Sequence, residues 1–109
     1  MTRGAIVVMA ARGAYTSKPG PPAVVVQANQ FSPTHPSVTV CPITSECADA
    51  PLFRVTLPPG NRTGLSAVSQ VMVDKMVSIP RAAIVRQIGF CDPTYVDAID
   101  EALRVWLAL

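Results

Sequence analysis

Only a few residues of this chain combine a reactive side chain with a position that could support chemistry. Thr44 and Ser45 follow the apolar stretch Val40-Cys41-Pro42-Ile43, so two adjacent hydroxyls are expected where a strand ends. A hydroxyl at such a place can hydrogen-bond a phosphate oxygen, and an ordinary strand-end threonine is the plainer interpretation. Asp74, directly before Lys75, has the pattern of a solvated or ion-paired carboxylate.

The basic side chains that could bind an anion are scattered. Arg12 and Lys18 fall in Ala10–Pro22, a segment rich in Gly, Pro, Ser and Thr that is expected to form a mobile loop. Both could contact phosphates or simply solubilise the loop, and Arg81 and Arg86 are weaker candidates of the same kind. The net charge of +2 neither establishes nor excludes nucleic-acid binding.

The metal-ligating and thiol side chains give little support for a metal site. His35, the single histidine, lies between two prolines and is expected to be an exposed loop residue. Cys41, Cys47 and Cys91 form an odd set without a CxxC pair, so zinc has weak support. We therefore expect reduced thiols, a cytoplasmic protein, and no metal or cofactor.

Length and composition point to one globular domain over residues 1–109. The 109 residues are 50% hydrophobic and only 15% charged, which excludes a disordered or charge-rich arm. A monomer this apolar would expose large patches, so a homodimer or partner interface is expected. No apolar run approaches the length of a membrane span.

Short strands followed by a helix are the elements that must position these side chains. Strands are predicted at Gly4–Met9, Ala23–Gln27, Ser37–Thr44, Leu52–Leu57, Val68–Val73 and Ala83–Phe90. From Asp92 the period changes to that of a helix, with Asp92 as N-cap and Pro93 in the first turn. Val96, Ile99, Leu103 and Trp106 lie on one face, and Trp106 is expected in the core or a dimer contact rather than stacked on a base. The fold class is mostly β with a C-terminal α-helix.

Several stretches in this order resemble the MazF/PemK (Kid-like) toxins of bacterial toxin–antitoxin pairs. No single motif is specific, and the ordered series over nearly the whole chain carries the resemblance. The matching stretches are Arg3-Gly4, Pro22–Gln27, Val40–Ser45, Ala50–Val55, Gly64-Leu65, Ser69–Lys75, Ile79–Arg81, Ile88-Gly89 and the helix Val96–Leu109.

The resemblance implies a fold, an activity and partners. It implies an SH3-like barrel of the MazF/CcdB type, a homodimer, a cognate antitoxin and single-stranded RNA as substrate. It also implies metal-independent, sequence-selective endoribonuclease activity by 2′-hydroxyl attack, which needs a base, an acid and a donor to the charged phosphorane. Thr44 matches the family's catalytic threonine, with Ser45 as a donor beside it. Asp74 matches a carboxylate that one branch of the family uses as a base.

The chain departs from the family pattern at its basic positions. The family's active-site arginine precedes the proline of the second strand, and Pro21 or, with a one-residue gap, Gly20 occupies that place here. Lys18 and Arg12 are the expected replacements, and Arg86 stands one place from another missing arginine, where Gln87 precedes Ile88-Gly89. Ala5 replaces the acidic residue that often follows Arg-Gly.

Three functions remain in view after these departures. The first is the endoribonuclease. The second is a family member whose catalysis is impaired because the arginine is missing, but which still dimerises and binds RNA and antitoxin. The third is a CcdB-like gyrase inhibitor, which the Trp106–Leu109 end supports only superficially.

Overall fold

Seven strands and one long helix make up the fold. The computed structural model describes residues 1–10 and 20–109, so Arg12 and Lys18 lie outside the described residues. In chain order the elements are β1 (Ala5–Met9), β2 (Pro22–Val25), β3 (Ser37–Thr44), β4 (Arg54–Leu57), β5 (Ser69–Met72), the 3₁₀ turn η1 (Val73–Lys75), β6 (Val77–Pro80), the 3₁₀ turn η2 (Arg81–Ala83), β7 (Ile84–Phe90) and α1 (Pro93–Leu107).

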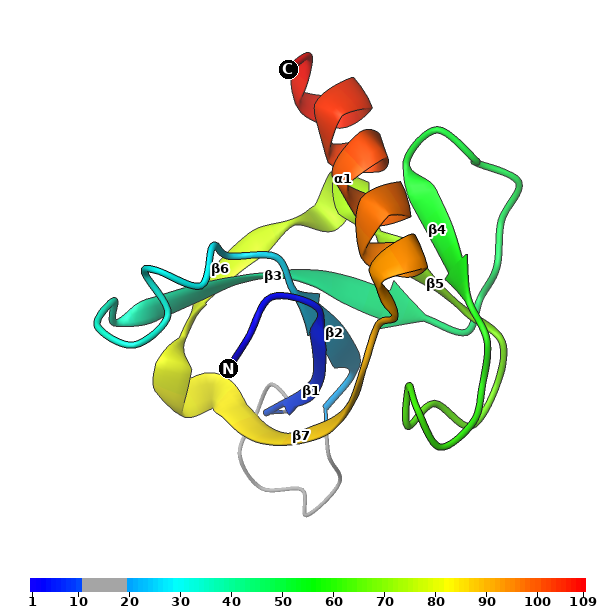
Figure 1. The fold of residues 1–109 in the computed structure, drawn as a ribbon. Helices are drawn as coiled ribbons and strands as arrows, with labels where there is room; N and C mark the ends of the chain where they lie inside the picture. The colour runs from blue at the N-terminus through cyan, green and yellow to red at the C-terminus, as the bar shows by residue number, and fades with distance from the viewer. Residues whose placement is uncertain (11–19) are drawn as a thin grey trace.

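One antiparallel sheet bends into a barrel. Its order is β4-β5-β3-β2-β1-β7, and β6 pairs with the first half of β3. Since η2 joins β6 directly to β7, the strands β7, β1, β2, β3 and β6 close around a common interior (Figure 1). Val7, Val25, Val38 and Val40 fill that interior and are fully buried. This agrees with the barrel that the resemblance implied.

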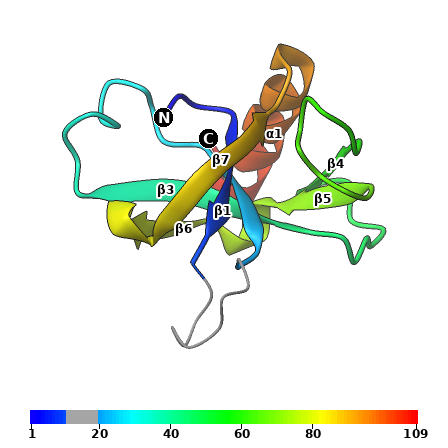
Figure 2. The same cartoon turned by 90° about the horizontal axis from the view of Figure 1, so that it is seen from below.

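A second core lies on the other face of the same strands, under α1. Ile6, Val24 and Cys41 point to this side, where they meet Leu57 of β4 and Ile99 of α1. Alternate residues of β1 and β2 therefore face two different cores, which is why these two strands are apolar throughout. β3 links the two halves of the molecule, since β6 pairs with its beginning and β5 with its end (Figure 2).

The strand and helix predictions are largely confirmed, with three differences. Val77–Pro80 is a strand that was not among those predicted from the sequence. Asp92 precedes the helix, but its side chain makes no capping bond and pairs with Arg62 instead. Trp106 is not in the core, because the residue is 49% exposed and its ring lies beside that of Phe53, with the ring centres 5.5 Å apart. The alternative expectation for Trp106, a dimer contact, stays a prediction. Among the described residues, no helix is long and apolar enough to cross a membrane.

Candidate active site

Thr44 is the last residue of β3 and lies between two neighbouring strands. On one side it pairs with Gln70 of β5. On the other side β2 runs antiparallel to β3, with Ala23 opposite Pro42, and continuing this register by two residues places Pro21 opposite Thr44. The position that lacks the family's arginine is therefore beside the threonine. Thr44 is half-buried and its Oγ1 accepts a hydrogen bond from the backbone N–H of Glu46, 3.1 Å away.

Gln70 is the fixed centre of a polar cluster next to Thr44. Its Nε2 donates to the carbonyl of Ala48 (3.1 Å), and its Oε1 accepts from the N–H of Ala48 (2.9 Å). Nε2 also lies 3.4 Å from Oγ1 of Thr56. Gln70 is 8% exposed, and these paired bonds fasten the chain that follows Thr44 onto β5.

Arg54 of β4 brings a positive charge into the same cluster. Its Nη1 donates to Oε1 of Gln70 (3.1 Å) and to the carbonyl of Glu46 (3.0 Å). Glu46 thus bonds to Thr44 through its N–H and to Arg54 through its carbonyl. In the sequence Arg54 is only one residue of the predicted strand Leu52–Leu57, and neither Arg54 nor Gln70 was predicted as a site residue.

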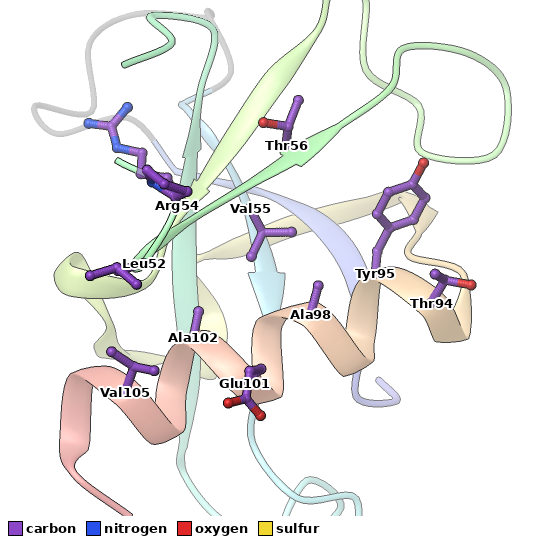
Figure 3. A pocket seen from close by; sticks show the side chains of 11 residues that line it. Leu52, Arg54, Val55, Thr56, Thr94, Tyr95, Ala98, Glu101, Ala102 and Val105 are labelled. Carbon is purple, nitrogen blue, oxygen red and sulfur yellow. The ribbon is translucent and has the colours of Figure 1, made fainter. Parts of the chain in front are cut away.

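A groove between β4 and α1 adjoins this cluster. Its volume is about 590 Å³, and its apolar walls include Leu52, Val55, Tyr95, Ala98, Ala102 and Val105. Figure 3 shows Val55 of β4 facing Ala98 and Ala102 of α1, whereas the guanidinium of Arg54 points away from the helix. Arg54 and Thr56 line the groove and also belong to the Gln70 cluster, so the two features are continuous.

Asp74 lies in η1, beside the middle of β3 rather than its end. The negative charge of Asp74 helps to raise the pKa of Cys41, a residue of β3 that pairs with Val24. Cys41 lies three residues before Thr44 in the same strand. Oδ1 of Asp74 is buried and has no hydrogen-bond partner within the described residues. No hydrogen bond joins Asp74 to Thr44 in the described part of the chain. A catalytic role for Asp74 stays a prediction, and the structure gives it a place apart from the Thr44 cluster.

The remaining predicted residues lie at different places. Ser45 is exposed and adjoins Thr44 directly. Arg86 is exposed on β7 and pairs with Val8, three strands away from β3 in the sheet order. His35 is exposed, as expected, and its Nδ1 accepts from the N–H of Ser37 at 3.1 Å. Of the predicted set within the described residues, only Thr44 and Ser45 lie together.

The thiols are free, as expected, and two of them are buried. Burial raises the pKa of Cys41 to about 11, and burial likewise raises the pKa of Cys91 to about 11, so both stay protonated at neutral pH. Cys47 is exposed. Residues 1–10 and 20–109 contain no group of three or more His, Cys, Asp or Glu side chains that could hold a metal ion.

Comparison with known proteins establishes the class to which this fold and site belong. The sequence profile of the PemK-like, MazF-like toxins of type II toxin–antitoxin systems matches residues 2–107. The chain therefore belongs to this toxin family, which confirms the resemblance drawn from the sequence.

A full-length relative and two solved structures are similar to this chain over nearly all of their length. The chain is 43% identical to the Probable endoribonuclease MazF of Mycolicibacterium smegmatis over 109 residues, which are 100% of this chain and 98% of the relative. Among solved structures, the Mycobacterium tuberculosis toxin MazF-mt6 superposes with a TM-score of 0.81 at 25% identity, covering 96% of this chain and 97% of the toxin. An endoribonuclease in complex with its cognate antitoxin, from a mycobacterial species, shares the fold with a TM-score of 0.81 at 18% identity. The superposition covers 100% of this chain and 96% of that endoribonuclease.

Proposed function

We propose that this MazF-like toxin is an endoribonuclease that cleaves single-stranded RNA by attack of a ribose 2′-hydroxyl on the adjacent phosphate. Membership of the toxin family and the full-length relative named as an endoribonuclease support RNA cleavage. They do not favour an impaired scaffold or a CcdB-like gyrase inhibitor. The observation that carries the mechanism is the position of Thr44, half-buried at a strand end with Gln70 and Arg54 at its side.

Thr44 has the hydrogen-bonding state that this reaction needs. Its oxygen already accepts the N–H of Glu46, so its own proton is free to donate outward to a phosphate oxygen. In the reaction the 2′-oxygen bonds to phosphorus while the bond from phosphorus to the 5′-oxygen breaks. A base takes the 2′-hydroxyl proton and an acid protonates the 5′-oxygen, which yields a cyclic phosphate and a 5′-hydroxyl. Donors around Thr44 stabilise the extra charge on the phosphorane.

The test is cleavage of a long, mixed-sequence single-stranded RNA by the purified protein in EDTA. We expect fragments with 5′-hydroxyl ends, and a loss of roughly 10²-fold or more in rate for Thr44→Ala, because one well-placed donor contributes about that much. Thr44→Ser keeps a hydroxyl and should retain part of the activity. An inactive wild-type protein, or a fully active Thr44→Ala variant, would contradict the proposed function.

We also propose that the toxin works as a homodimer in the cytoplasm and is inhibited by a cognate antitoxin. The exposed apolar side chains at the end of α1, with Trp106 at 49% and Leu109 at 83%, would be covered in a dimer. Only 15% of the residues of the chain are charged, so the antitoxin should bind mainly through apolar anchors. Its affinity should then fall only modestly between low and high salt, and a steep salt dependence would contradict this.

A further inference from the structure

Thr44 lacks the arginine that the family places beside it, so the cationic donor of the reaction must come from elsewhere. Pro21 and Gly20 carry no charge, and both lie directly before β2. Among residues 1–10 and 20–109, the guanidinium tied most directly to Thr44 is that of Arg54. One residue, Glu46, bonds to Oγ1 of Thr44 with its N–H and to Nη1 of Arg54 with its carbonyl.

The charge of Arg54 is not neutralised by a carboxylate. In the described part of the chain the ion pairs join Arg3 to Asp100, Arg62 to Asp92 and Arg104 to Glu101. Arg81 donates to carbonyls at the opposite end of β3, those of Ser32 and His35. Arg54 therefore holds a free positive charge at the polar cluster, which attracts a phosphate.

The hydrogen bonds of Arg54 leave one edge of the guanidinium open. Nη1 donates to Glu46 and Gln70, while Nε is buried and has no partner among residues 1–10 and 20–109. Nη2 makes no hydrogen bond within the described residues, so its two N–H groups are available to a ligand. Holding a partly desolvated, incompletely bonded guanidinium costs stability, and such a cost is typical of groups kept for function.

Gln70 fixes where that open edge lies. Its own amide is anchored at both ends by Ala48, so Oε1 is a stationary acceptor for Nη1. Because the guanidinium is planar, a fixed Nη1 also limits the position of Nη2. We propose that Arg54 contacts the phosphate bound at Thr44 and stabilises its developing charge, and that Gln70 is a positioning residue for Arg54. This inference rests on the proposed function.

Variants of Arg54, with Arg104 as a matched control, test the contact. Arg54→Ala should lower kcat for RNA cleavage about 10²- to 10³-fold, with a smaller change in KM, because the donor acts on charge that develops in the transition state. Arg54→Lys keeps the positive charge without the planar guanidinium, so its kcat should lie between those of the wild type and Arg54→Ala. Arg104→Ala removes the same charge from an exposed helix position and should leave cleavage unchanged.

Guanidinium rescue separates a phosphate contact from a merely structural role. Guanidinium chloride, far below its unfolding concentration, should raise the rate of Arg54→Ala at least several-fold and leave Thr44→Ala unchanged. If Arg54→Ala does not fold, the contact is tested with Arg54→Lys, provided that its thermal transition matches that of the wild type. We expect Arg54→Lys to cleave RNA at least tenfold more slowly than the wild type. Gln70→Met should lower kcat in the wild-type background and have a clearly smaller effect in the Arg54→Ala background, where only its bonds to Ala48 remain to be lost.

The outcomes distinguish this inference from the proposed function. If Thr44→Ala is inactive while a folded Arg54 variant cleaves within about threefold of the wild type, the role of Arg54 is refuted and the endoribonuclease stands. Additive effects of Gln70→Met and Arg54→Ala would refute the positioning role. A wild-type protein that cleaves no RNA would overturn both.

Discussion

Replacing Pro21 by arginine tests whether the place beside Thr44 is as open as the strand register indicates. Pro21 is exposed and its carbonyl accepts the N–H of Met9 at 3.1 Å, a bond that any residue at this position can keep. An arginine there would begin opposite Thr44, one strand away on the side that faces β2. Loss of the rigid ring should cost roughly 0.4–1 kcal/mol of unfolding free energy.

The size of the gain depends on whether Arg54 already acts on the phosphate. One new donor is worth about 10²–10³ in rate when none is present. With Arg54 in place, we expect Pro21→Arg to raise kcat less than about tenfold. In the Arg54→Ala background the same change should recover a large part of the lost rate, roughly 10-fold or more, because the two guanidinium groups would serve one phosphate.

Single-turnover cleavage of one RNA by the four proteins of this cycle is the assay, and Gly20→Arg is the control. A Cβ at Gly20 would clash with the carbonyl oxygen of Met9, so this variant should be strongly destabilised and give no gain. A gain near 10²-fold for Pro21→Arg in the wild-type background would show that Arg54 does not act as the donor. No gain in either background would mean that the register argument is wrong.

Three further predictions concern stability, thiol chemistry and assembly. Ile99→Ala should lower the free energy of unfolding by about 2–5 kcal/mol in denaturant titrations, since Ile99 is 2% exposed between the helix and the sheet. Maleimide at pH 8 should modify Cys47 in the folded protein, and Cys41 and Cys91 only after unfolding. Burial raises the pKa of both buried thiols from 9.0 in the unfolded chain to about 11 in the folded protein. The protonated thiols therefore stabilise the fold fully below pH 9, and the free energy of unfolding should fall as the pH rises from 9 to 11. Trp106→Ser should shift the protein toward monomers in sedimentation, whereas a monomeric wild type at micromolar concentration would contradict the dimer.

Local patterns were enough to predict most of the fold. The alternation of Val55 and Leu57 and the 3.6-residue spacing of Val96, Ile99 and Leu103 depend on neighbours in sequence, and both elements are present. The end of the helix face was predicted less well. Trp106 continues the spacing, but its ring lies beside Phe53, which precedes β4, and the residue is left half-exposed.

Strand β6 could not be predicted from local pattern because its stability comes from pairing. Val77–Pro80 is mostly exposed and contains a proline, which is unusual within a strand. It is held by four residue pairs with β3, from Ser37 opposite Pro80 to Val40 opposite Val77. Proline at the end of this segment falls where the chain turns into η2, so the missing N–H costs the ladder little.

The candidate site shows the same division between local and long-range information. Thr44 could be placed at a strand end from its own segment, because an apolar run stops there. Arg54 could not be joined to it, because in sequence it belongs to the polar face of another strand. The two meet only through β5, which pairs with β3 at Gln70 opposite Thr44 and with β4 at Gln70 opposite Thr56. A glutamine within the mostly apolar predicted strand Val68–Val73 was the one local signal available, since a polar side chain in a β-core needs hydrogen-bond partners. Gln70 therefore links the part of the site that the sequence predicted to the part that only the fold could assemble.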